Sequence, residues 1–208
     1  KSHKGPGGDD TFRRWPAGGR IVFGSNREFA DPTARLYIMD ADGRNGQRIP
    51  TRDDEAARFP TPTPDGRDVF YRGGSAYAGS PYRVVGLESG APRDVFHTGP
   101  IGREVHRPFA LSRDGGDIAF VQEGNEPREI VVMGRHGENR RTVATYALGF
   151  LDAPAWSGDG RIAYTAVYRP ANGAGRGRAD IHVVDADGGN EVVLTHTRSY
   201  DGMPAWSP

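Results

Sequence analysis

The chain has 208 residues, no cysteine, and 27 basic residues balanced by 27 acidic ones. This composition excludes a disulfide framework, a thiolate metal site and a thiol nucleophile. A chain with no net positive charge also lacks the field that would attract nucleic acid or an anionic membrane, so neither is expected as a partner.

Thirty glycines and 16 prolines break the apolar residues into short runs. Such runs, bounded by turn residues, predict an all-β fold. No stretch approaches the roughly 18 apolar residues that a membrane span needs, so we expect no membrane insertion. The opening residues are Gly-rich and polar, which predicts a disordered tail over residues 1–11.

In chain order, one pattern of four elements occurs four times. An apolar strand follows a glycine turn, with central residues separated by 48, 49 and 44 positions: Ile21, Val69, Ile118 and Ile162. A second strand is expected at residues 35–40, 81–86, 128–133 and 180–185. A short third strand follows at 47–49, 93–96, 141–144 and 191–195. The fourth segment leads to the next glycine turn, at 58–66, 107–115 and 153–160, and recurs unfinished at 203–208.

A period of 40 to 50 residues with four strands in each repeat predicts a β-propeller, whose blades cover each other's faces. We expect a single domain over residues 12–208. Its repeat units run over about 15–57, 58–106, 107–152 and 153–202, followed by a closing strand at 203–208.

The unfinished phrase "MPAWSP" predicts how the ends of the chain meet. We expect Met203–Ser207 to pair with the strand around Ile21–Phe23, which would clasp both ends into one blade. Trp15 competes with Trp206 for the same place, because it precedes Arg20 as Trp156 precedes Arg161. The alternative is that the chain is part of a larger propeller.

The repeat resembles that of TolB-like β-propellers, in which a strand ending in WSPDG precedes an apolar strand and an I-Y-V-M-D-A-D-G hairpin. The matching segments are "PAWSGDGRIAY" from Pro154, "LYIMDADGRN" from Leu36 and "IHVVDADGGN" from Ile181. The resemblance covers about Trp15 to Pro208. It implies a bacterial protein that is periplasmic or extracellular and acts as a docking platform for other proteins.

Alternation of the strands puts the short "PDG" and "DADG" turns at one end of each blade and the long loops at the other. We call the end of the blade that carries the long loops the long-loop end. Aromatic residues in or beside its loops, with neighbouring arginines, are typical of peptide and sugar sites. The predicted ligand-binding residues are Tyr77, Arg103, Tyr146, Tyr168, Arg169 and Tyr200.

Histidines and a carboxylate in the same loops offer an alternative, a small lyase or hydrolase. Its catalytic residues would be His97, Glu104, His106 and His196. No H-E-x-x-H spacing fixes a geometry for them. We therefore favour a non-catalytic module that binds a protein, peptide or carbohydrate as a monomer or homodimer, without a metal or cofactor.

Overall fold

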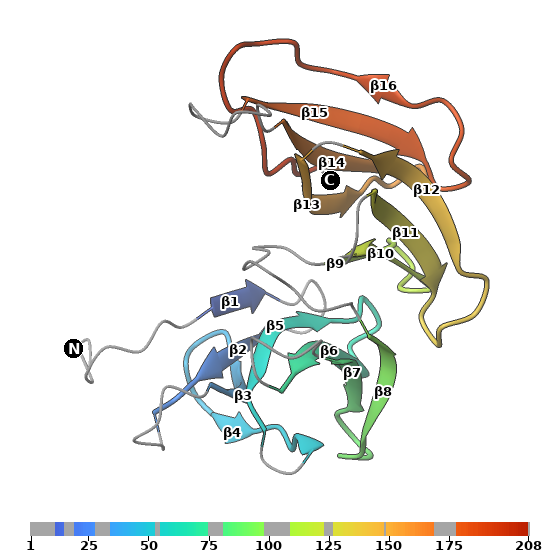
Figure 1. Cartoon of the computed structure of the whole chain (residues 1–208). Helices are drawn as coiled ribbons and strands as arrows, with labels where there is room; N and C mark the ends of the chain where they lie inside the picture. Colours follow the sequence, from blue (N-terminus) through green and yellow to red (C-terminus); the bar gives the residue numbers. More distant parts are fainter. Residues whose placement is uncertain are drawn as a thin grey trace. The chain divides into compact units, whose positions relative to one another are not determined.

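A computed structural model describes residues 19–27, 34–52, 55–74, 81–96, 109–122, 127–147, 149–168 and 178–207, with the backbone alone of 11–14 and 97. Every regular element in these ranges is a β-strand, and together they form four antiparallel four-stranded sheets (Figure 1). The predicted all-β fold of four repeated sheets is confirmed. The described residues include no helix with the length and apolar character needed to cross a lipid bilayer.

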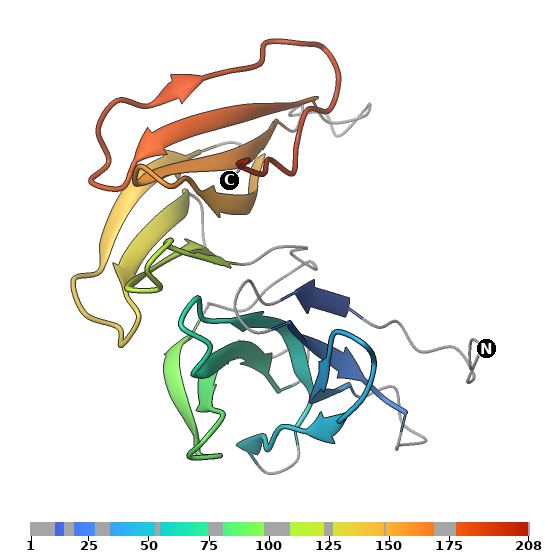
Figure 2. The ribbon, with the colours of Figure 1, turned by 180° about the vertical axis from the view of Figure 1, so that it is seen from behind.

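The sheets follow the repeats in order, and Figure 2 shows them from behind. Sheet 1 contains β1 (Thr11–Arg14), β2 (Arg20–Ser25), β3 (Arg35–Asp40) and β4 (Gln47–Arg48). Sheet 2 contains β5 (Ala57–Pro62), β6 (Asp68–Gly73), β7 (Pro81–Gly86) and β8 (Pro92–His97). Sheet 3 contains β9 (Phe109–Leu111), β10 (Asp117–Gln122), β11 (Arg128–Gly134) and β12 (Arg141–Tyr146). Sheet 4 contains β13 (Gly149–Trp156), β14 (Arg161–Tyr168), β15 (Arg178–Asp185) and β16 (Val192–Val193).

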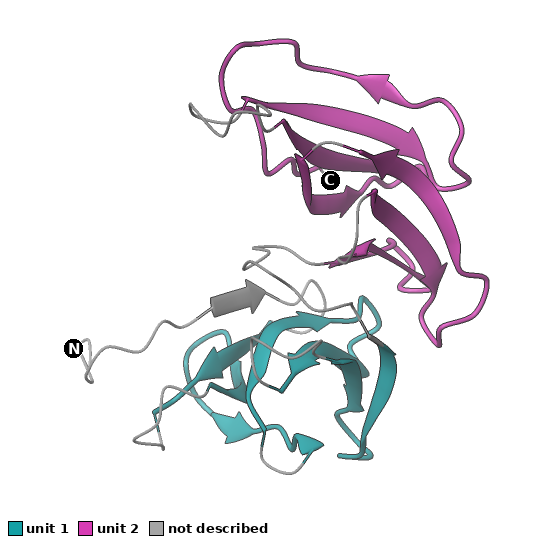
Figure 3. Ribbon diagram, viewed as in Figure 1, with its two compact units in different colours: residues 1–97 teal, residues 98–208 magenta. Residues whose placement is uncertain are grey.

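The sheets are grouped in two compact units, residues 1–97 and 98–208, called unit 1 and unit 2 (Figure 3). The core of unit 1 includes Val22 and Ile38 of sheet 1 with Val69 and Val85 of sheet 2. In unit 2 the corresponding residues come from sheets 3 and 4, such as Val121 and Ile162. Each core therefore forms where one sheet packs face to face on the next.

The glycine turns are formed by local hydrogen bonds, and the same set of bonds occurs in sheets 2, 3 and 4. In sheet 4 the backbone N–H of Arg161 donates to Oγ of Ser157 at 2.7 Å, and that hydroxyl also bonds to Asp159. Gly160 completes the turn with a φ of 90°, which a glycine adopts without steric cost. Thr63 and Ser112 make the same contacts before β6 and β10, so these turns follow from the sequence directly.

Both edges of β2 are paired within unit 1, so the prediction that Met203–Ser207 pairs with Ile21–Phe23 is wrong. β1 holds one edge of β2, with Phe12 opposite Phe23, and β3 holds the other edge. β1 needs only a short connection to reach β2, and closing a short loop costs less chain entropy than closing a long one. Trp15 lies outside the described residues.

Met203–Ser207 instead packs on sheet 4, as the first strand of a further sheet would. Trp206 donates from Nε1 to the carbonyl of Ala155 at 3.0 Å, and Trp156 donates to Ala110 of sheet 3 at 3.1 Å. The amide of Asp201 donates to Ala179 at 3.0 Å, as that of Ala57 donates to Ala34 at 2.9 Å. The segment therefore repeats the contacts by which sheets 2 and 4 begin.

A backbone feature marks the same point in three repeats. Phe59, Ala153 and Met203 have φ values of 54°, 52° and 57°, although none is a glycine. Each precedes a proline, which disfavours the right-handed helical conformation for the residue before it. In β5 and β13 this residue lies inside the first strand of the sheet, at the bulge where the pairing register shifts.

Candidate functional site

The long-loop end of sheet 4 brings two predicted tyrosines together. Tyr146 ends β12 and Tyr168 ends β14, and their rings meet edge to face with centroids 5.3 Å apart. Arg178 begins β15 directly opposite Tyr168, and its guanidinium carbon lies 5.3 Å from the centroid of that ring. We call Tyr146, Tyr168, Arg178 and Asp180 the tyrosine–arginine cluster.

Asp180 holds the guanidinium of Arg178 in place. The two residues are two apart on β15 and so lie on the same face of the sheet. Nε and Nη2 of Arg178 both donate to Oδ2 of Asp180, at 3.0 and 2.7 Å. The Asp180 side chain is 0% exposed, whereas that of Arg178 is 42% exposed. The buried carboxylate therefore orients a cation that faces solvent.

Tyr146 stands in the buried part of this cluster. Burial raises the pKa of its hydroxyl above the ordinary value, and the neighbouring Tyr168 adds to the effect. The hydroxyl oxygen is buried and makes no hydrogen bond to the described residues. Tyr146 is therefore neutral over the physiological range and serves as a support for the ring of Tyr168.

Beside the cluster, β13 starts at a position that only glycine fits. Gly149 has a φ of 141°, and a Cβ there would lie 1.9 Å from the carbonyl oxygen of Val167. Arg128 donates from Nη1 to the Gly149 carbonyl at 2.7 Å and places its guanidinium carbon 4.2 Å from the ring centroid of Phe150. Arg128 and Phe150 are not among the ligand-binding residues predicted from the sequence.

Tyr200, the third predicted tyrosine among the described residues, lies at the same end but beside the backbone of β15. It forms a parallel bridge with Ala179, and its side chain is near Gly202 and Thr165. Tyr200 is 53% exposed, and burial of its remainder, with the Asp152 carboxylate nearby, raises the pKa of its hydroxyl. The exposed part of the Tyr200 side chain can contact a partner, and no hydrogen bond or ring contact joins it to Tyr168 within the described residues.

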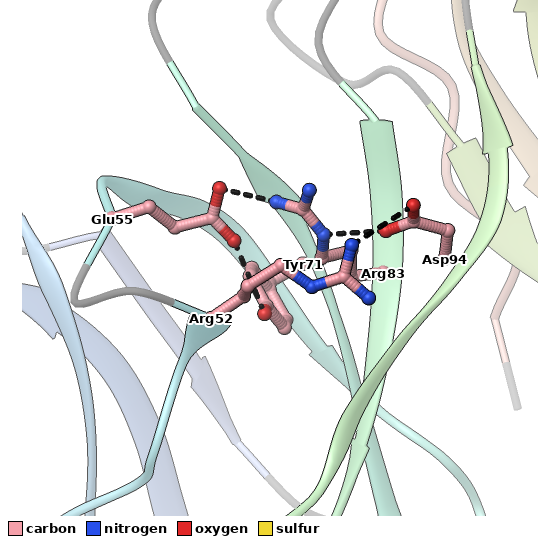
Figure 4. A network of polar contacts seen from close by, with 5 residues as sticks. All are labelled: Arg52, Glu55, Tyr71, Arg83 and Asp94. Atoms are coloured by element: carbon pink, nitrogen blue, oxygen red, sulfur yellow. Dashed lines mark hydrogen bonds and ion pairs between the residues drawn. The ribbon is translucent and has the colours of Figure 1, made fainter.

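Unit 1 contains a polar network near the long-loop end of sheet 2 (Figure 4). Arg83 of β7 donates from Nη1 to Glu55 and from Nε to Oδ1 of Asp94, the latter at 2.6 Å. The hydroxyl of Tyr71 donates to Glu55 at 3.4 Å, and Arg52 donates to Asp94 at 3.2 Å. We call these five residues the Arg83 network.

The Arg83–Glu55 pair at the centre of the network is largely shielded from water. The side chains of Arg83 and Glu55 are 10% and 15% exposed. Burial, reinforced by Glu55, raises the pKa of Tyr71 to about 12. The network ties the loop that carries Glu55 to strands β6, β7 and β8. The sequence gives no sign of the partners of Glu55.

A third polar group lies within sheet 4. The hydroxyl of Tyr164 donates to Glu191, and Nδ1 of His182 is 3.1 Å from Oε1 of the same carboxylate. The rings of Tyr164 and His182 stack with centroids 5.2 Å apart. Burial raises the pKa of the Tyr164 hydroxyl, and its hydrogen bond to Glu191 raises the pKa further. His182 is buried, so it has a structural place within the sheet.

The remaining predicted residues are only partly covered by the structure. Tyr77, Arg103 and Arg169 lie outside the described residues, as do Glu104 and His106. His97 ends β8, but its side chain is not described, and His196 is exposed after β16. The proposed catalytic group therefore stays a prediction. Over the described ranges, no three His, Asp or Glu side chains are arranged to hold a metal ion.

The family of the chain follows from a match over residues 84–195 to the model of the lipoprotein LpqB β-propeller domain. The matched segment is more than half of the 208 residues. The chain belongs to the LpqB β-propeller family. Among proteins with a curated function, none matches it in sequence.

Solved structures with the same fold include two TolB proteins. TolB from Acinetobacter baumannii is 19% identical with a TM-score of 0.70, over 100% of this chain and 48% of that one. A putative TolB from Agrobacterium tumefaciens is 17% identical with a TM-score of 0.65, over 88% and 63% of the two chains. The LpqB-family chain thus spans about half the length of the first TolB structure. The resemblance to TolB-like propellers is confirmed.

An enzyme structure is also similar. An oligogalacturonate lyase in complex with manganese is 12% identical with a TM-score of 0.63, over 85% of this chain and 49% of that chain. At such identities these likenesses establish the β-propeller fold of the LpqB-family chain and leave its chemistry to be argued from its own residues.

Proposed function

We propose that this LpqB-family chain is a non-catalytic binding module that recognises a protein or peptide at the long-loop end of sheet 4. The observation that carries this proposal is the tyrosine–arginine cluster. Tyrosine and arginine are enriched where protein interfaces gain most of their binding energy. Here the rings of Tyr146 and Tyr168 and the guanidinium of Arg178 are already packed together at the end of the sheet.

The cluster is suited to binding because it is ordered in advance. Ring contacts and the buried Asp180 hold Tyr168 and Arg178, so a partner would order few further side chains. Reducing the loss of side-chain freedom on association leaves more of the contact energy as affinity. Exposed Tyr200 extends the surface on the neighbouring side of β15.

The comparisons support a docking role in the bacterial envelope. The family is named for a lipoprotein, and the TolB proteins share the fold. On this basis we propose a periplasmic or extracellular location for the chain. A protein ligand also agrees with the near-zero formal charge, since no long-range field selects a polyanion.

Site-directed photo-crosslinking in the native host tests the proposal. A benzoylphenylalanine in place of Tyr200 should capture a defined partner, and Tyr168→Ala in the same chain should reduce the yield without changing the circular dichroism spectrum. A crosslinker at Asp187, in the exposed turn at the opposite end of sheet 4, is the control. Equal capture from position 187, or no adduct from position 200, contradicts the proposal.

A further inference from the structure

The Arg178 guanidinium has one edge engaged and one edge directed away from its carboxylate. Asp180 accepts the hydrogen bonds of Nε and Nη2 through a single oxygen, Oδ2. A guanidinium carries five N–H donors in a rigid plane, so Nη1 and the second hydrogen of Nη2 form a further donor edge. With 42% of the side chain exposed, that edge is accessible to a ligand.

Two contacts, each supported by a further residue, fix the direction of this edge. Asp180 is fully buried and is placed by β15, and Thr195 Oγ1 lies 3.5 Å from its second oxygen. The ring of Tyr168 lies against the guanidinium, and Tyr146 supports that ring from the side. A planar fork held in this way matches the two oxygens of a carboxylate, which it can bind through two parallel hydrogen bonds.

We propose that Arg178 is the carboxylate-binding residue of the site, and that it takes an acidic side chain or the terminal carboxylate of a peptide from the partner protein. This inference rests on the proposed binding function and names its ligand chemistry.

A peptide fits the surroundings better than an acidic sugar. Sugar rings are usually held by stacking on an open aromatic face, but the guanidinium of Arg178 lies over the ring of Tyr168. The Tyr146 ring meets Tyr168 at an interplanar angle of 82°, so the pair offers no flat platform. An extended peptide needs no such platform, because its backbone can follow the strand ends while one carboxylate meets Arg178.

The chain provides a matched control at the opposite end of sheet 4. Arg161 also pairs with an aspartate two residues away, with Nε 3.1 Å and Nη2 2.8 Å from Oδ2 of Asp159. Its guanidinium likewise lies by an aromatic ring, 5.1 Å from the centroid of Trp206. The difference is the carboxylate, because Asp159 is 60% exposed whereas Asp180 is 0% exposed. The Arg161 pair is thus a surface pair, which water can loosen.

The test follows the Nε–Hε resonances of the arginines by ¹⁵N NMR during peptide titrations. The probes are Ac-Ala-Glu-Tyr-Glu-Ala-NH2, the matched glutamine peptide with an amidated end, and the glutamine peptide with a free carboxyl end. We expect either acidic probe to shift the Arg178 resonance saturably, with affinity about tenfold or more above that of the amidated glutamine peptide. The two acidic probes separate a side-chain carboxylate from a terminal one.

Variants then assign the effect to the fork. Arg178→Lys keeps the charge but loses the planar fork and should weaken binding of the acidic probe about tenfold, and Arg178→Gln at least as much. Because Arg178→Gln leaves buried Asp180 unpaired, the double variant Arg178→Gln/Asp180→Asn provides a neutral pair if the single variant does not fold. Arg161→Gln should bind as the parent chain does.

Three results overturn the inference. One is binding of neither acidic probe to the parent chain, and another is equal weakening by Arg161→Gln, which would indicate a diffuse charge effect. The third is Arg178-dependent binding of digalacturonate more tightly than the peptides, which would make the ligand a saccharide. If crosslinking from position 200 still captures a partner in the first two cases, the binding function stands and only the carboxylate assignment fails.

Discussion

The Arg83 network and the tyrosine–arginine cluster use the same chemistry for different ends. In unit 1 a guanidinium lies between two carboxylates and is 10% exposed, whereas in unit 2 a single buried carboxylate holds a guanidinium that is 42% exposed. An arginine that is enclosed by carboxylates holds a loop in place. An arginine that is held by one buried carboxylate keeps part of its guanidinium exposed to solvent. An ion pair in which both side chains are buried is therefore structural, whereas a buried carboxylate with an exposed arginine indicates a candidate binding residue.

Arg83→Met should have the largest effect on stability. It leaves Glu55 without its guanidinium partner in a poorly hydrated position, and breaking a buried ion pair from one side costs about 3 to 5 kcal/mol. Urea denaturation gives the free energy of unfolding. The conservative variant Arg178→Lys should lose much less, because it keeps a cation beside Asp180; similar losses would remove the distinction between the two regions.

Gly73→Ala should come next, with a loss of about 1 to 3 kcal/mol. A Cβ at this position would lie 2.2 Å from Nη1 of Arg83 and 2.6 Å from Oε1 of Glu55, so the network would have to shift. Gly46→Ala is the control, because its Cβ would meet Met39 at an ordinary 4.0 Å. Thermal unfolding of both variants measures the difference, and an equal shift in Tm would show that the network has room to move.

The pH dependence of stability at high pH should reveal Tyr71. Its folded pKa is raised from 10.0 to about 12, so the folded chain holds this proton more tightly than the unfolded chain does. The associated stability is fully present below pH 10 and is lost as the pH rises from about 10 to 12, by roughly 1 to 3 kcal/mol. Tyr71→Phe should flatten the fall in unfolding free energy over this range. An unchanged slope would place Tyr71 outside the ion network.

Tyr146→Phe should have the smallest effect. The hydroxyl it removes is buried without a hydrogen bond to the described residues, so its loss leaves no partner unsatisfied. We expect a change within about 0.5 kcal/mol in urea denaturation. A larger loss would mean that the hydroxyl does hold the cluster together, as that of Tyr71 holds Glu55.

The strands and turns could be predicted because their causes are local in the sequence. Ser157, Asp159 and Gly160 form their turn through contacts within a few residues, and the same Ser/Thr-x-Asp-Gly spacing recurs before β6 and β10. The face shared by Tyr168 and Arg178 also follows from strand alternation once the sheet is known. The pair Arg178 and Asp180 could thus have been found as alternate residues of one strand.

The pairing of distant segments could not be read in this way. From the sequence, both β1 and Met203–Ser207 were possible partners for β2. Which of them pairs with β2 depends on how the chain folds between the repeats, and the repeat pattern does not contain that information. The partners of Glu55 were hidden for a similar reason, since Arg83 is 28 positions further along the chain and comes close only through the packing of sheet 2. The periodic sequence pattern identifies strands, whereas an ion network depends on which loops and strands the fold brings together.

The positive φ of Phe59, Ala153 and Met203 has a consequence for how the molecule unfolds. A residue other than glycine in this conformation carries an energetic cost of about 1 kcal/mol or more, which persists only while its surroundings hold it. Here those surroundings include the preceding sheet, through contacts such as that from Trp206 to Ala155. Within each unit, a sheet that loosens therefore releases the chain segment that packs on it, and opening should spread from one sheet to the next as in a one-dimensional cooperative system.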